Sequence, residues 1–271
     1  MASSTDISVS SLKSSEPVRT APPAAIVCRQ VSKSFYFYEH RTVSLREAFI
    51  RTVRRRPLHV GAPTFMLRDF SLTVAPGEAV ALIGPNGSGK STALRLIGGI
   101  YTPSAGCVET RGRLASVIEL GAGFHPELTG AENVALYGAV MGLGRAEIQA
   151  RLPEIIAFAG VQEFTDVPLK YYSSGMQARL AFAVTVCVEP DILLLDEVLA
   201  VGDQWFRQRC LQRLRDFRVR GGTLVIVSHD LDTISELCSR AVWLDHGAVR
   251  MDGAVEAVTA AYRAAASAGG A

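Results

Sequence analysis

Short runs of consecutive apolar residues recur along the chain, each bounded by glycine, proline or charged residues. A short, fully apolar run predicts a strand that is buried on both faces of a sheet. Three such strands are expected at residues 79–83, 191–195 and 223–227, the second and third of which begin with Asp191 and Thr223 before the apolar residues. Apolar residues at helical spacing lie between them, so the pattern predicts an α/β domain.

Weaker patterns predict the remaining elements. Further strands are expected at residues 24–31, 66–74, 107–110, 114–120, 241–244 and 248–251. Helices are expected at residues 129–141, 145–159, 174–188 and 203–220, and a last helix from about residue 255 occupies residues 253–271 together with a flexible tail. Thr129 and Glu132 form a capping box before the first of these helices. No strand signal interrupts the stretch from about 120 to 186, which therefore predicts a helical subdomain set into the α/β core.

Two segments differ from the rest in composition. Residues 1–23 are rich in serine and proline and lack the apolar centre of a secretory signal, so a flexible leader is expected. Residues 38–63 form a basic insertion in which Leu45, Phe49 and Val53 recur at i, i+4 and i+8 among arginines, the pattern of an amphipathic helix. Such a helix either packs on its own domain or lies against an anionic lipid surface or a membrane partner.

Composition and charge limit the function classes. The 271 residues are 48% hydrophobic, enough for a large core, and the formal net charge of +2 is too balanced to indicate nucleic-acid binding. The five cysteines are scattered, which fits reduced thiols in a cytosol better than a disulfide scaffold or a zinc site. The longest apolar runs, such as 181–188, fall far short of the roughly 20 residues of a membrane helix. Any membrane association is therefore expected to come through a partner.

A glycine-rich loop after the strand at 79–83 carries the clearest chemical signal. Glycines in such a loop let backbone N–H groups point inward around a diphosphate, and the dipole of the following helix adds positive potential. A plain turn is the alternative, but the strand before the loop and the helix after it favour a nucleoside triphosphate site. Lys90 is expected to reach the β- and γ-phosphates, and the Ser91 hydroxyl to bind Mg²⁺. The full segment reads Gly84-Pro85-Asn86-Gly87-Ser88-Gly89-Lys90-Ser91-Thr92.

Two other strand ends carry candidate catalytic groups. Asp196 and Glu197 end the strand at 191–195, and α/β folds place their chemistry at the carboxyl ends of strands. Asp196 is expected to hold Mg²⁺, and Glu197 to polarise the attacking water. His229 follows the strand at 223–227 and is either structural or in contact with the γ-phosphate.

A helix start and an aromatic cluster complete the candidates. Ser173 or Ser174 is expected to cap the next helix, and its exposed N–H groups form either an ordinary cap or a second anion site. The aromatic residues at 35–38 either belong to the core or include one ring that stacks on adenine.

Taken in order, five motifs resemble those of the nucleotide-binding subunits of ABC transporters over residues 24–252. The motifs are the phosphate loop, the acidic-glycine turn at 119–123, the helix start at 173–177, the strand end at 193–197 and Ser-His-Asp at 228–230. The resemblance implies a P-loop NTPase core of the ABC ATPase type, with an inserted helical subdomain and a small antiparallel β part. It also implies ATP and Mg²⁺ as cofactors and a head-to-tail homodimer.

The resemblance also implies a role for each matching residue. The helix start of one copy would close on the ATP held by the phosphate loop of the other copy, through Ser173, Ser174, Gly175 and Gln177. Glu197 would act as the catalytic base and His229 as the sensor of the γ-phosphate. Asp203 matches the loop that crosses the dimer seam, and Phe35 matches the adenine-stacking aromatic.

Two positions depart from the family pattern. The usual Leu-Ser-Gly-Gly-Gln signature reads Tyr-Ser-Ser-Gly-Met at 172–176, so Ser174 adds a side chain where backbone approaches phosphate. Glu119 stands where the family carries a glutamine that faces Mg²⁺ and the permease. A carboxylate still ligates Mg²⁺, but it adds a negative charge beside the nucleotide. Both departures bear on rate and coupling rather than on the class.

The same segments are similar to one subgroup of the family, which exports cell-surface polysaccharides such as O-antigen, teichoic acid and galactan. The similarity lies in residues 119–133, 172–176 and 196–203, together with the extended segment at 36–63. It implies a lipid-linked polysaccharide as cargo, two membrane-spanning permease subunits as partners, and a peripheral location at the cytoplasmic face of the cell membrane. Some members carry a C-terminal carbohydrate-binding domain, which is not expected here, and no nucleic-acid partner is expected.

Two other functions stay open. The first is an ABC exporter ATPase for another cargo, a drug or a lipid, against which the subgroup motifs argue. The second is a soluble ABC-type ATPase that acts on nucleic acid or ribosomes. Such proteins usually carry two nucleotide domains or a long coiled-coil insertion, and the sequence shows neither.

Overall fold

The computed structural model describes residues 23–35, 64–118, 121, 123–196 and 203–268. Residues 1–22 of the expected leader, the basic insertion at 38–63, Glu119, Glu197 and the last three residues lie outside this part of the chain.

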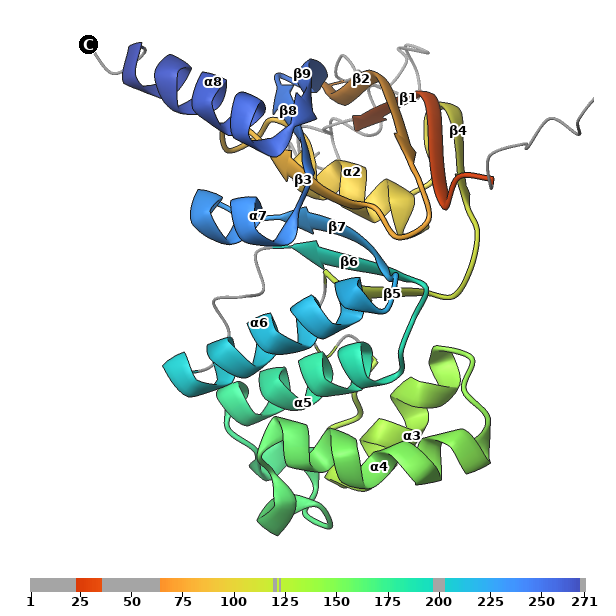
Figure 1. The fold of residues 1–271 in the computed structure, drawn as a ribbon. Helices are drawn as coiled ribbons and strands as arrows, with labels where there is room; N and C mark the ends of the chain where they lie inside the picture. The colour runs from red at the N-terminus through yellow and green to blue at the C-terminus, as the bar shows by residue number, and fades with distance from the viewer. Residues whose placement is uncertain (1–22, 36–63, 119–120, 122, 197–202, 269–271) are drawn as a thin grey trace, which may run out of the picture.

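A six-stranded sheet forms the centre of the domain, with strand order β5-β6-β7-β3-β8-β9 (Figure 1). Neighbouring strands from β5 to β8 run parallel, and β9 pairs antiparallel with β8 at one edge. The strands are β3 (Ala79–Ile83), β5 (Leu114–Val117), β6 (Ile192–Asp196), β7 (Thr223–Val227), β8 (Arg240–Asp245) and β9 (Ala248–Ala254).

Alternate side chains of these strands point to opposite faces and divide the hydrophobic core in two. In β3, Ala81 and Ile83 belong to one buried cluster, whereas Val80 and Leu82 belong to the other. Because both faces of the sheet are covered, β3 is apolar at every position and β7 at every position after Thr223. The strands predicted at 79–83 and 223–227 are confirmed with these bounds, and the one predicted at 191–195 is β6.

A smaller antiparallel sheet covers one face, with strand order β2-β1-β4. Its strands are β1 (Ile26–Phe35), β2 (Thr64–Val74) and β4 (Ala105–Thr110). The helix α2 (Lys90–Ile97) lies between the two sheets and contacts strands of both. This arrangement is the small antiparallel part that the resemblance implies.

Helices cover the opposite face and extend away from it (Figure 1). The helices are α3 (Gly130–Val140), α4 (Arg145–Ala159), α5 (Ser174–Cys187), α6 (Gln204–Val219), α7 (Leu231–Leu237) and α8 (Val255–Ala268), with short 3-10 helices η1 (Gln162–Phe164) and η2 (Leu169–Tyr171). Helices α3, α4 and α5 pack on one another in the region predicted to be a helical subdomain. Helix α8 packs on the hairpin of β8 and β9.

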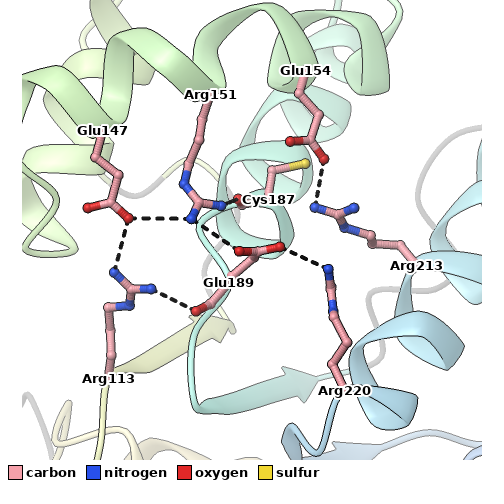
Figure 2. A network of polar contacts seen from close by, with 8 residues as sticks. All are labelled: Arg113, Glu147, Arg151, Glu154, Cys187, Glu189, Arg213 and Arg220. Atoms are coloured by element: carbon pink, nitrogen blue, oxygen red, sulfur yellow. Dashed lines mark hydrogen bonds and ion pairs between the residues drawn. The ribbon is translucent and has the colours of Figure 1, made fainter.

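A network of ion pairs joins these helices to the sheet, and we call it the junction network (Figure 2). At its centre, the Glu189 carboxylate lies 3.1 Å from the Arg151 guanidinium of α4 and 2.8 Å from the Arg220 guanidinium at the end of α6. Burial acts to raise the pKa of Glu189, but the pairing with arginines outweighs it and the pKa is lowered. The network comprises Arg113, Glu147, Arg151, Glu154, Cys187, Glu189, Arg213 and Arg220.

The predicted capping box at the start of α3 is confirmed. The Thr129 hydroxyl accepts a hydrogen bond from the Glu132 amide at 3.2 Å, and the Glu132 carboxylate accepts one from the Thr129 amide at 2.8 Å. The Thr129 amide and the Thr129 hydroxyl both donate to the Glu132 carboxylate, and these two bonds favour its charged form and lower the pKa of Glu132.

Several predicted bounds were wrong. Strand β1 continues to Phe35 instead of ending at Val31, because Lys33, Ser34 and Phe35 still pair with β2 past a bulge. Strand β5 ends at Val117 rather than at 120. Strand β9 continues to Ala254 instead of ending at 251, because its last residues pair with the start of β8.

One helix, α7, was not predicted at all. It is short, and Asp230 caps it by accepting hydrogen bonds from the amides of Asp232 and Thr233.

The five cysteines are free thiols: Cys28, Cys107, Cys187, Cys210 and Cys238. Burial raises the pKa of Cys28, Cys210 and Cys238 to about 12. Across the described residues, no helix has the length and apolar character that crossing a bilayer requires.

Candidate nucleotide-binding site

The glycine-rich loop lies at the carboxyl end of β3, where it leads into the first turn of α2. Strand β3 is fully buried and hydrogen-bonded between β7 and β8, so the start of the loop is fixed by the centre of the sheet. Gly89 adopts a left-handed conformation and precedes the first residue of α2, Lys90. The loop therefore occupies the place that the sequence predicts, between a buried strand and a helix N-terminus.

A cavity of about 150 Å³ opens beside this loop. The Ser88 hydroxyl is buried close by and has no hydrogen-bond partner within the described chain. The Lys90 side chain is 5% exposed, and its ammonium donates to the carbonyls of Gly84 at 2.8 Å and Pro85 at 2.9 Å. A buried cation at the cavity and an unpaired buried hydroxyl in the same loop fit an anionic ligand such as a phosphate group. The lining residues are Met66, Asn86, Gly87, Gly89, Lys90, Ser91 and Thr92.

Two of the predicted Mg²⁺ ligands lie together at this loop. The Ser91 hydroxyl, in the first turn of α2, donates to the Asp196 carboxylate at 3.3 Å. Asp196 ends β6, which is separated from β3 by a single strand, β7. A hydroxyl and a carboxylate oxygen beside a phosphate site fit Mg²⁺, which prefers oxygen ligands and keeps some positions for phosphates. The third predicted ligand, Glu119, lies outside the described residues, as does the predicted base Glu197.

His229 follows β7, so the structure places it at the same edge of the sheet as Asp196 and the loop. Its side chain is exposed. The next residue, Asp230, anchors the segment: its carboxylate accepts from the Thr233 hydroxyl at 2.8 Å and from the Arg207 guanidinium at 2.6 Å. The hydrogen bonds from Thr233 and the charge of Arg207 lower the pKa of Asp230.

The predicted second anion site is an exposed helix start. Ser173, not Ser174, caps α5, and its hydroxyl accepts from the Met176 amide at 3.2 Å. Ser173, Ser174 and Gly175 are exposed. The Gln177 side chain instead donates to the carbonyls of Leu169 and Tyr172, at 3.1 and 3.4 Å. Helices α2 and α5 lie in different parts of the domain (Figure 1), so the structure does not gather this helix start with the loop of the same chain.

Asp203 and Phe35 occupy defined positions at the ends of elements. Asp203 caps α6 by accepting from the Phe206 amide at 2.8 Å, and its carboxylate lies 4.0 Å from the Arg179 guanidinium of α5. Phe35 ends β1 and packs edge-on against Tyr101, with 5.5 Å between ring centroids. Neither geometry tests the role that the resemblance implies.

Sequence reasoning missed residues that contact the loop from other elements. Met66 of β2 lines the cavity, and Gly247 in the turn between β8 and β9 donates its amide to the Ser88 carbonyl at 3.1 Å. The residues Asp245-His246-Gly247 between two short strands carry a hairpin signal, but nothing in the sequence says what the hairpin touches.

A glycine loop between a central parallel strand and a helix, with a carboxylate on a nearby strand end, defines a P-loop nucleoside triphosphate-binding protein. The comparisons identify its family. The family model described as "ABC transporter" matches residues 67–200. The "O-antigen export system ATP-binding protein RfbB" of Klebsiella pneumoniae is 45% identical over 235 residues, which cover 87% of this chain and 96% of that protein. The chain therefore belongs to the ABC transporter family and is an ATPase of that family.

Other relatives are longer than the part they share with this chain. The Myxococcus xanthus protein of the same name is 45% identical over 249 residues, 90% of this chain and 56% of that protein. The "Teichoic acids export ATP-binding protein TagH" of Bacillus cereus is 39% identical over 236 residues, 87% of this chain and 42% of that protein. The chain spans about half the length of these two relatives.

Solved structures show the same fold. A structure titled "Structure of ATP binding subunit of ABC transporter" superposes with a TM-score of 0.70 at 23% identity, over 88% of this chain and 93% of that one. The dimeric cassette MJ0796, bound to ADP and phosphate, superposes with a TM-score of 0.67 at 23% identity, over 85% of this chain and 98% of that one. At this identity the likeness establishes the fold alone.

Proposed function

We propose that this chain is the ATP-binding and hydrolysing subunit of an ABC transporter that powers export of a lipid-linked cell-surface polysaccharide across the cytoplasmic membrane. The observation that carries the ATPase part is the pairing of Ser91 with Asp196 at 3.3 Å, beside the phosphate loop. The cargo is supported by relatives named for O-antigen and teichoic acid export. It is also supported by the subgroup motifs in the sequence.

In this proposal the loop amides and Lys90 bind the phosphates of ATP. Mg²⁺ would be held by Ser91 and Asp196, with Glu119 as a further oxygen ligand, and would supply charge neutralisation at the phosphates. Glu197 accepts the proton of the attacking water, and His229 contacts the γ-phosphate. The edge of the sheet at which β3, β6 and β7 end supports this division of roles, because each strand brings one of these groups there.

The proposed active form is a head-to-tail homodimer bound to two membrane-spanning permease subunits at the cytoplasmic face. The exposed start of α5, with Ser173, Ser174 and Gly175, has free space for a ligand held by a second copy. Asp203 would lie at the seam between the copies, and its 4.0 Å contact with Arg179 supports a link from that seam to α5. Phe35 would stack on adenine.

Depletion of the protein in its native cell tests the proposed cargo. The cell is then complemented with the wild-type chain, with Lys90→Ala, or with the control Lys170→Ala. Lys170 lies in the 3-10 helix η2 and pairs with Glu127. Lipid-linked glycan inside the cell and polymer outside are both quantified. Depletion is expected to raise the amount of lipid-linked glycan inside the cell and to lower the amount of polymer outside. Only the wild-type chain and the control variant are expected to restore both amounts.

No change in either pool on depletion would refute the polysaccharide cargo and leave an exporter of a drug or a lipid. Full rescue by Lys90→Ala would refute the proposed use of ATP in export.

A further inference from the structure

The turn between β8 and β9 reaches across to the phosphate loop. The Gly247 amide donates to the Ser88 carbonyl at 3.1 Å, and the Gly247 carbonyl accepts from the Arg68 amide of β2 at 2.8 Å. One residue of the hairpin therefore connects the loop to a strand of the other sheet. No residue of this hairpin is among the candidate nucleotide ligands.

The turn leaves no space for a side chain at Gly247, because strand β2 packs directly against it. Gly247 has φ +81°, and a Cβ atom there would lie 2.9 Å from the Met66 carbonyl oxygen and 3.2 Å from the Leu67 Cα. At the other end of the loop, a Cβ on Gly84 would lie 2.1 Å from the Leu244 carbonyl oxygen of β8. The hairpin thus touches the phosphate loop near both of its ends, backbone against backbone.

These contacts matter because of how a phosphate loop works. A loop whose N–H groups point inward toward an anion turns its carbonyls outward, and each outward carbonyl needs a partner. The Ser88 carbonyl accepts a hydrogen bond from the Gly247 amide. The Ser88 hydroxyl is buried and has no hydrogen-bond partner among the described residues. Met66, whose carbonyl lies against Gly247, also lines the cavity beside the loop.

We propose that Gly247 is a positioning residue for the phosphate loop: the β8–β9 turn holds the loop in the conformation that binds the phosphates of ATP. The inference rests on the proposed assignment of this loop as the ATP site. Gly247 acts through Ser88 and Met66 and does not itself touch the nucleotide.

The test compares Gly247→Ala with Gly142→Ala. Gly142 is the matched control, because it has φ +83° in an exposed turn between α3 and α4 and an added Cβ would meet nothing within 4 Å. Both variants gain the strain of alanine at positive φ, so both lose some thermal stability. Only Gly247→Ala is expected to weaken binding of ATP, by roughly tenfold to a hundredfold, because only there is the loop displaced. Dissociation constants come from isothermal titration with ATP and Mg²⁺, and melting temperatures from calorimetry.

Equal ATP affinity of Gly247→Ala and the wild type would overturn the inference. If the wild type itself fails to bind ATP, the proposed function fails instead, so the two failures are distinguishable.

A second measurement needs no variant and holds even where Gly247→Ala does not fold. Hydrogen exchange of the wild-type protein is followed with and without ATP. The Gly247 amide is expected to exchange more slowly when ATP is bound, together with the loop amides, whereas the Gly253 amide in the adjoining strand β9 keeps its rate. Unchanged exchange at Gly247 under saturating ATP would also overturn the inference.

Discussion

Two regions of the molecule are stabilised by different forces: the surroundings of the phosphate loop, and the junction network. Around the loop, β3 is buried between two neighbouring strands, and backbone groups pack directly against one another. At the junction, arginines and carboxylates that are partly exposed hold α4 and α6 to the sheet (Figure 2). Apolar packing is strong and insensitive to salt, whereas partly exposed ion pairs are weak and screened. Apolar burial thus fixes the loop, whereas the junction network adds weak, screened ion pairs to the apolar core that α4 and α6 already share with the sheet.

The largest effect is expected in the sheet beneath the loop. Leu82 of β3 is fully buried, so Leu82→Ala leaves a cavity and is expected to lower the free energy of unfolding by about 2–5 kcal/mol. Leu136→Ala is the matched control, because Leu136 on α3 is 38% exposed. Urea denaturation measures both. A loss no larger than that of the control would contradict the view that apolar burial holds this region.

A smaller effect is expected at the junction. Glu189→Gln removes the charge that Arg151 and Arg220 pair with while keeping the length of the side chain. Because the glutamate side chain is 43% exposed, we expect a loss of only about 1 kcal/mol of unfolding free energy, with ATP affinity unchanged. The exposed Glu256 of α8 supplies the control, Glu256→Gln. A loss as large as that of Leu82→Ala, or a changed affinity, would show that the two regions are not separate.

The smallest effect is the dependence of that loss on pH. The pKa of Glu189 is lower in the folded protein than in the unfolded chain. Its contribution is therefore fully present above the unfolded value of about 4.3, and it is lost as the pH falls through the folded value. The difference in unfolding free energy between the wild type and Glu189→Gln is expected to be constant near neutral pH and to shrink at acid pH. A difference that grows as the pH falls would contradict the pairing.

The sequence predicts the parts of the fold that depend on local pattern. The buried strands β3 and β7 match their predicted bounds because each apolar run is at most five residues long, too short for a buried helix. The capping box of α3 was found for the same reason, since both partners lie within one turn. Strand β1 was cut short because the polar residues Ser32, Lys33 and Ser34 follow Val31, although pairing with β2 continues.

Contacts between distant segments were not predictable from one sequence. Gly247 reaches Ser88, and Arg151 reaches Glu189, only after the chain has folded. The candidate site follows the same rule. Its loop and strand-end residues were predicted from motifs, whereas Met66 was not, because a strand residue with an apolar side chain carries no chemical signal.

The proposed roles of Glu197 as catalytic base and of a head-to-tail homodimer as the active form are tested most directly with Glu197→Gln. ATP affinity, the rate of hydrolysis and the molar mass by light scattering are measured with and without ATP, for this variant and for the wild type. The account predicts wild-type affinity, loss of hydrolysis, and a dimer that persists only when ATP is present. Hydrolysis by Glu197→Gln at the wild-type rate would contradict it.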